Sequence, residues 1–155
     1  LAGPRVRGLP SDDDGFVLVD ELGRVDGVQD VFAAGDATTF PLKQGGVATQ
    51  QADAAAEAIA ARAGADLEPR PFRPVLRGLL LTGMAPRFLR AEPRTRGSVI
   101  DTEPLWWPPA KIVGRYLAPF LAERLGLAQV LPDAARAAPV PVEVELTGQG
   151  AWSKV

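Results

Sequence analysis

The chain has 155 residues and a mass of 16.4 kDa, with 46% hydrophobic and 23% charged residues, the balance of a folded globular protein. Lys and Arg number 17 against 19 Asp and Glu, so a net charge of −2 gives no general attraction to nucleic acid. The chain contains no Cys and no His, which excludes disulfide chemistry, Cys nucleophiles, Ser-His-Asp triads and zinc sites built on these residues.

The first residues of the chain and its hydropathy are used to predict where in the cell the protein lies. Leu1 is not an initiator residue, and residues 1–8 lack the basic and apolar regions of a signal peptide, so we expect an excised piece of a longer chain. No apolar run reaches the length that spans a bilayer. A cytoplasmic location is the expectation.

The first part of the chain contains the clearest secondary-structure signals. Residues 16–19 predict a short strand that forms a hairpin with residues 24–26, and residues 31–34 predict a buried strand. An Ala-rich stretch from about Gly46 to Arg62 predicts a helix that stops at Gly64.

The rest of the chain gives weaker signals. Residues 75–82 and 87–91 predict two antiparallel strands around a turn, followed by an irregular loop over 93–104. Apolar residues at helical spacing predict a helix from about Pro108 to Leu125, which Pro119 interrupts or kinks. A last strand is predicted within 140–146.

Charge is distributed unevenly. Residues 1–69 carry a net charge of −7, residues 70–96 carry +6 from seven Arg against Glu92, and residues 97–155 carry −1. This indicates either two lobes that attract one another or a basic face for an anionic partner. The second interpretation makes the chain a non-catalytic interaction or dimerisation module with an Arg-rich binding face. Nucleic acid is not an expected partner, because few aromatic side chains accompany the Arg residues.

One constellation indicates a cofactor site. The apolar run at 31–34 leads into Gly35-Asp36, where a bare backbone allows close approach and a carboxylate accepts hydrogen bonds from sugar or polyol hydroxyls. Lys43-Gln44-Gly45-Gly46-Val47 then opens the predicted helix, whose first N–H groups carry partial positive charge. These features together describe one side of a pocket for a nucleotide-like cofactor.

Residues 8–61 resemble the second FAD-binding segment of the FAD-dependent pyridine nucleotide–disulfide oxidoreductase superfamily. The resemblance lies in Gly8-Leu9-Pro10, in the Val-Phe-Ala-Ala-Gly-Asp-Ala run ending at Ala37, and in the Lys-Gln-Gly-Gly helix start, which is similar to the branch of NADH dehydrogenases. The resemblance implies an α/β fold of α+β character, with the C-terminal part of a Rossmann-like FAD-binding domain at 1–65 and a small interface domain at 66–155.

The same resemblance assigns roles to individual residues. It implies that Asp36 binds the ribityl chain of FAD while Gly35 allows the approach. The residues expected near the flavin ring are Lys43, Gln44, Gly45, Gly46 and Val47. The chain would then be part of an oxidoreductase that passes electrons from NAD(P)H through FAD to a quinone or another acceptor, with no catalytic side chain and no metal of its own.

The chain lacks several features of the family, and their absence limits which branch and which part of the flavoprotein it resembles. The glycine fingerprints for FAD and NAD(P)H are missing, since Gly148-Gln149-Gly150 has no strand-to-helix context. The fragment alone is therefore expected to be inactive, with the rest of its flavoprotein chain as partner. The lack of His and Cys disfavours the disulfide reductase and sulfide:quinone branches.

The helix predicted after Trp106-Trp107 has an apolar face, and two kinds of contact are alternatives for it. Its apolar face, next to Lys111 and Arg115, is expected to form a core or homodimer contact. The alternative is a peripheral contact with a membrane surface.

Overall fold

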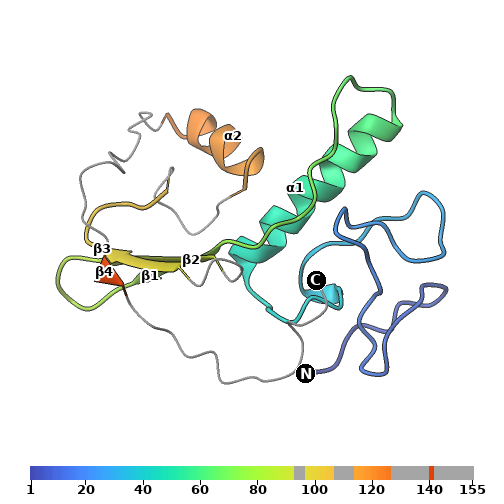
Figure 1. Ribbon diagram of the computed structural model, residues 1–155, viewed down its shortest axis with the longest axis horizontal. Coiled ribbons are helices and arrows are strands. Elements are labelled where there is room, and N and C mark those ends of the chain that lie inside the picture. The colour runs from blue at the N-terminus through green and yellow to red at the C-terminus, as the bar shows by residue number, and fades with distance from the viewer. Residues whose placement is uncertain (93–96, 107–113, 127–139, 142–155) are drawn as a thin grey trace. The chain divides into compact units, whose positions relative to one another are not determined.

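A computed structural model describes residues 1–92, 97–106, 114–126 and 140–141 (Figure 1). Its described residues form two compact units. The first unit comprises residues 1–74 with the described part of 106–131, and the second comprises 75–105 with the described part of 132–155. The domain boundary predicted at residues 65 and 66 stays a prediction.

The N-terminal part of the first unit is held by isolated backbone bridges rather than regular strands. The predicted hairpin is present as a bridge between Val19 and Val25. Its turn is held by the Asp20 carboxylate, which accepts the backbone N–H groups of Leu22 and Arg24 at 2.9 Å each. Asp20 also binds Arg24 Nε at 2.7 Å, and these bonds hold the pKa of Asp20 below its usual value against the effect of partial burial.

The buried strand predicted over residues 31–34 is not a strand in the structure. Phe32 forms one antiparallel bridge with Arg24, and all four residues are only half-buried. A single bridge does not hold the backbone in a ladder. The Gly-Asp pair therefore follows an irregular segment and lies in a short 3₁₀ helix, η1 (Gly35–Ala37).

Helix α1 (Gly45–Arg62) confirms the predicted Ala-rich helix and its end. Gly64 follows with a φ of +94°, the left-handed conformation that commonly terminates helices. The buried face combines small and apolar side chains with two polar ones, Gln51 and Glu57. Gly23 approaches this helix so closely that an added Cβ would lie 3.1 Å from that of Ala55.

The predicted second helix is shorter than expected. Helix α2 (Leu117–Arg124) starts after Gly114–Tyr116, and residues 107–113 lie outside the described residues. The prediction that Pro119 interrupts the helix is wrong: Pro119 is the third helical residue, where a backbone N–H has no intrahelical partner to lose. Ala118 and Ala122 are buried, as is Trp106 from the preceding segment.

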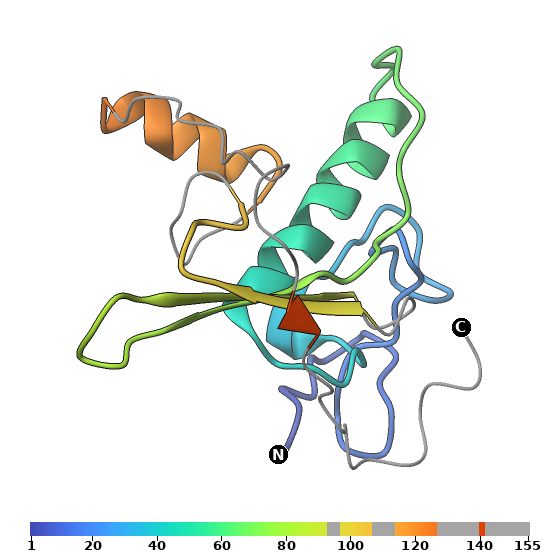
Figure 2. The ribbon, with the colours of Figure 1, turned by 60° about the vertical axis from the view of Figure 1, so that its left-hand side comes forward.

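The second unit is an antiparallel sheet with strand order β1-β2-β3-β4. Its long β1–β2 hairpin is seen in Figures 1 and 2. The predicted hairpin is confirmed as β1 (Leu76–Leu80) and β2 (Arg87–Glu92), paired from Leu76 opposite Ala91 to Leu80 opposite Arg87. Strand β3 (Gly97–Asp101) corrects the loop predicted over 93–104. Strand β4 (Val140–Pro141) pairs with β3 within the strand predicted at 140–146, and residues 142–146 lie outside the described residues.

The described residues thus form a mixed fold of α-helices and β-strands, in agreement with the coarse fold class predicted from sequence. Within them, no helix has the length and apolar character needed to cross a bilayer.

Candidate functional site

The predicted Gly-Asp pair lies against the first turns of α1. Gly35 has a φ of +81°, and an added Cβ would lie 3.3 Å from Cβ of Ala48. Its backbone N–H donates a hydrogen bond to Oε1 of Gln51 at 2.7 Å. Glycine is therefore required twice, by the backbone conformation and by the close approach to the helix.

Thr38 completes the attachment of η1 to α1. Its hydroxyl and its backbone N–H both donate to the Gly35 carbonyl, at 2.9 and 3.1 Å. The Gln51 amide lies 3.4 Å from the same hydroxyl. Thr38 and Gln51 are both buried, so this small polar network fixes the backbone that leads to Asp36.

Asp36 and Lys43 lie on the exposed side of this attachment. The Asp36 side chain is exposed, and Lys43 is half-buried. Lys43 Nζ donates to the Thr38 carbonyl at 2.5 Å and lies 4.0 Å from the centre of the Phe16 ring. Burial lowers the pKa of Lys43 from its usual value, while the nearby carboxylates of Asp36 and Asp12 oppose that shift.

The start of α1 combines exposed and buried backbone. Gln44 precedes the helix without a side-chain cap, and no acidic residue lies in the first turn. Gly45 is exposed with open space around the position of a Cβ, whereas Gly46 is buried. Val47 is a core residue, so it would meet a ligand only through its backbone. The structure thus brings η1, Lys43 and the helix start into one neighbourhood.

Sequence reasoning missed a second polar cluster, farther along α1. The Glu57 side chain is only 2% exposed and accepts hydrogen bonds from Arg70, Arg115 and Tyr116. Arg70 binds it with its backbone N–H at 2.8 Å and with guanidinium Nη2 at 2.5 Å, and the Tyr116 hydroxyl donates at 2.5 Å. We call Glu57, Arg70, Arg115 and Tyr116 the Glu57 cluster.

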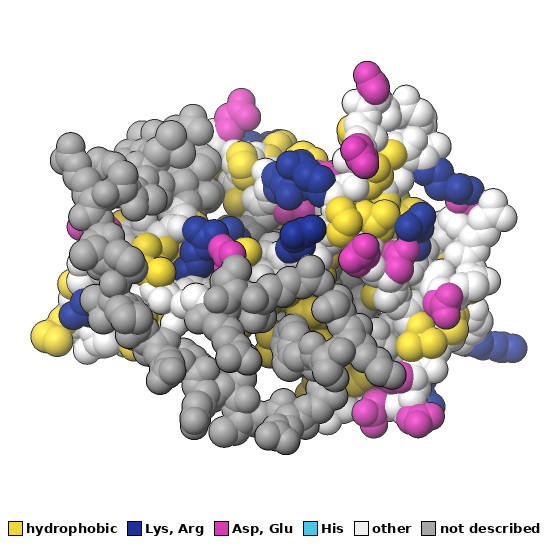
Figure 3. Space-filling model, in the orientation of Figure 1, with side chains coloured by type: hydrophobic (Ala, Val, Ile, Leu, Met, Phe, Trp, Pro, Cys, Tyr) yellow, Lys and Arg dark blue, Asp and Glu magenta, His cyan; other side chains and the backbone are white. Residues whose placement is uncertain are grey.

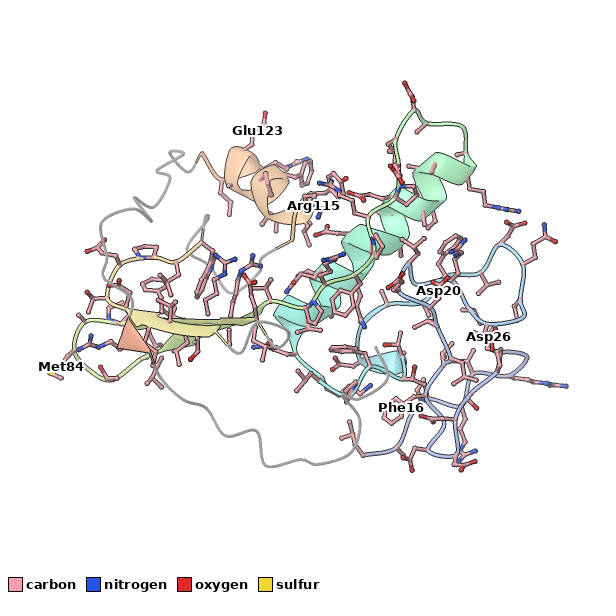
Figure 4. The ribbon with its side chains drawn as sticks, in the orientation of Figure 1. Phe16, Asp20, Asp26, Met84, Arg115 and Glu123 are labelled. Carbon is pink, nitrogen blue, oxygen red and sulfur yellow. The ribbon has the colours of Figure 1, made fainter. Side chains whose placement is uncertain are left out.

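The electrostatics of the Glu57 cluster keep the carboxylate charged. The hydrogen bonds from Arg70 make the largest contribution and hold the pKa of Glu57 far below its ordinary value, against the opposing effect of burial. Arg70 and Arg115 have side chains that are 59% and 44% exposed. Figure 3 shows basic side chains at the surface between α1 and α2, and Figure 4 labels Arg115 there.

Asp53 extends the cluster by one helical turn. Its carboxylate accepts the backbone N–H groups of Arg115 at 2.5 Å and Tyr116 at 3.4 Å. Together Asp53 and Glu57 hold residues 114–116 against α1. Because Glu57 is fully hydrogen-bonded within the protein, the cluster fastens parts of the chain together and offers no free carboxylate for proton transfer.

One sequence signal marks this cluster. Glu57 falls on the same helical face as Ala54 and Ala58, which are buried, and a carboxylate among buried alanines requires cationic partners. In the described parts of the chain, no group of three or more acidic side chains is arranged to hold a metal ion. No family model, curated protein or solved structure matches this chain.

Proposed function

We propose that this chain is the C-terminal portion of a flavin-dependent oxidoreductase, which passes electrons from NAD(P)H through FAD to a quinone or another acceptor. In this proposal η1 and the start of α1 form one side of a Rossmann-like FAD site. The rest of the site comes from upstream segments of the same flavoprotein.

The observation that carries the proposal is the packing of Gly35 on α1 with Asp36 exposed beside it. The 3.3 Å approach to Ala48 and the bond to Gln51 fix the backbone of Gly35, so the position of the adjacent Asp36 relative to α1 is set by buried contacts. An exposed carboxylate on a backbone fixed in this way suits the hydroxyl groups of a ribityl chain, because it can accept several hydrogen bonds.

The start of α1 and Lys43 fit the flavin ring chemically. The helix begins without an acidic residue in its first turn, and Gly45 leaves open space beside it. An uncompensated helix N-terminus favours negative charge, which a reduced flavin carries. Lys43 adds a cation near the same place, next to the carboxylates of Asp36 and Asp12. The bound flavin would supply hydride and electron transfer, while these residues bind and orient it.

Asp36→Ala tests the proposal in the flavoprotein that contains this segment. We expect the variant to lose FAD during gel filtration, measured as the ratio of flavin to protein absorbance. Asp26→Ala is the matched control, since Asp26 is an exposed carboxylate in the same unit and away from η1 (Figure 4). Unchanged FAD occupancy in Asp36→Ala would overturn the assignment of the ribityl role.

The isolated chain provides an independent test. Its 155 residues lack a glycine fingerprint for the pyrophosphate, so we expect weak FAD binding and no NAD(P)H oxidation. Stoichiometric FAD bound to the purified chain would contradict the inference that half of the site lies elsewhere. The alternative, a binding module with an Arg-rich face, predicts a salt-sensitive complex with an acidic protein that FAD does not affect.

A further inference from the structure

The turn between β1 and β2 exposes a cluster of large apolar side chains. Leu79 and Leu80 are exposed at the end of β1, and in the turn itself Leu81 is 77% exposed and Met84 is 82% exposed. We call residues 79–86 the apolar tip. Exposed single apolar residues are common, but four within six positions at one end of a hairpin form a patch of the kind that marks an interaction site.

The exposed apolar side chains of the tip lie on both faces of the sheet. Leu79 and Leu80 are successive strand residues, so their side chains point to opposite faces of the sheet. Pairing between β2 and β3 ends at Phe88 opposite Asp101, so the tip extends beyond β3. Figure 4 shows Met84 at the far end of the turn.

The apolar tip is uncharged, and an arginine precedes and follows it in sequence. Residues 78–86 contain no charged side chain, and the first charged residue in each direction is an arginine, Arg77 or Arg87. Arg87 is exposed and pairs with Leu80 in the strand register, at the base of the tip. The acidic Asp101 lies one register position farther from the tip, opposite Phe88.

We propose that the apolar tip inserts into the interfacial region of an anionic phospholipid membrane. A flat protein surface, or the sheet of a second copy, would cover one face of the tip and leave the other in water. Lipid surrounds an inserted group and covers both faces, and the exposed Arg87 at the base meets the phosphates at the depth where the apolar residues end. The turn is irregular, so its backbone must stay near the hydrated headgroups, which limits insertion to the interface. This proposal is independent of the flavin function.

Vesicle binding by the full chain tests it. We expect the chain to sediment with vesicles of phosphatidylcholine and phosphatidylglycerol, less with phosphatidylcholine alone, and less at high salt. Leu81→Ser/Met84→Ser should weaken binding by about a hundredfold, since each large apolar side chain buried is worth roughly tenfold. Arg87→Gln should weaken binding to the anionic vesicles by about fivefold.

The matched control is Leu125→Ser, because Leu125 is 71% exposed at the end of α2, the other candidate for membrane contact. It should bind as the unchanged chain does. The chain has no Cys, so an environment-sensitive fluorophore on Met84→Cys is a unique label that should shift to shorter wavelength with anionic vesicles. The same label on Leu67→Cys, in the first unit, should not shift.

Several outcomes would overturn the proposal. They are equal binding by Leu81→Ser/Met84→Ser and the unchanged chain, no binding to either vesicle, or loss of binding in Leu125→Ser instead. A dimer that dissociates in Leu81→Ser/Met84→Ser, without vesicle binding by the unchanged chain, would assign the tip to a second copy.

Discussion

The backbone N–H of Gly35 donates to Oε1 of Gln51 across 16 residues of sequence, at a distance of 2.7 Å. This bond fastens η1 to the second turn of α1, and the adjacent Asp36 carboxylate stays exposed. The relation between the proposed ligand-binding carboxylate and the helix start therefore depends on the buried amide of Gln51. Predictions about the candidate site begin with this attachment.

Gly35→Ala should lower the free energy of unfolding by about 2 kcal/mol. A Cβ at this φ of +81° costs about 1 kcal/mol, and the contact with Ala48 at 3.3 Å adds a similar amount. Gly8→Ala is the matched control, with a φ of +85° and open space around the Cβ, and should lose only about 1 kcal/mol. Urea denaturation measures both, and equal losses would contradict the close approach to Ala48.

Glu57→Gln should lower the free energy of unfolding by about 2 kcal/mol at neutral pH, because hydrogen bonds from Arg70 and Arg115 to a buried charge are replaced by weaker ones. The pKa of Glu57 is lowered on folding, so its stabilisation is present above its ordinary pKa of 4.5 and is lost as the pH falls below that value.

The pH dependence of Glu57→Gln provides the sharper measurement. The difference in unfolding free energy between the unchanged chain and Glu57→Gln should shrink as the pH decreases from about 5 to the lowest value at which both fold. Glu68→Gln, which removes an exposed carboxylate, should leave the stability and its acid dependence unchanged. A constant difference across the acid range would show that Glu57 does not titrate with a lowered pKa.

Tyr116→Phe should lower the free energy of unfolding by about 1 kcal/mol, because it removes the hydroxyl that donates to Glu57 at 2.5 Å. The loss in Glu57→Gln/Tyr116→Phe should be smaller than the sum of the two single losses, since both changes break one bond. Additive losses in a double-mutant cycle would show that the two side chains do not interact.

Asp36→Asn should lower the pKa of Lys43 further. The Asp36 carboxylate raises that pKa, in opposition to the larger lowering by burial, so its removal leaves burial less opposed. Chemical shifts of ¹³C-dimethylated amines measure the titration, and the chain offers only Lys43, Lys111, Lys154 and the N-terminal amine as signals. Asp26→Asn is the control that should leave it unchanged. An unchanged pKa in Asp36→Asn would place the two side chains too far apart to share a ligand.

Elements whose signals are local were predicted well. The Ala-rich composition and Gly64 fix the extent of α1, and turn residues between two apolar runs mark the β1–β2 hairpin. Strand β3 was missed because Pro93, Gly97 and Pro104 favour a loop in isolation. The pairing of Val99 and Ile100 with β2 overrides that local preference.

The candidate site was predicted only where its residues lie close together in sequence. Gly35, Asp36 and Lys43 lie within nine residues, so their proximity to the helix start follows from a short connection. The Glu57 cluster was not predicted, because its partners Arg70 and Arg115 lie 13 and 58 residues away in sequence. Single-sequence patterns carry no information about which arginine reaches a buried carboxylate at that separation.

Glu57 accepts hydrogen bonds from two arginines of the first unit. Arg70 lies shortly before the chain leaves that unit, and Arg115 lies after the chain has returned to it. One carboxylate thus closes a chain loop that contains β1, β2 and β3. During synthesis, α1 emerges with Glu57 unable to meet Arg115 until 58 further residues have been made. Glu57, in the C-terminal half of α1, therefore reaches its final set of ionic contacts only late in biosynthesis, after the entire β1–β3 region has left the ribosome.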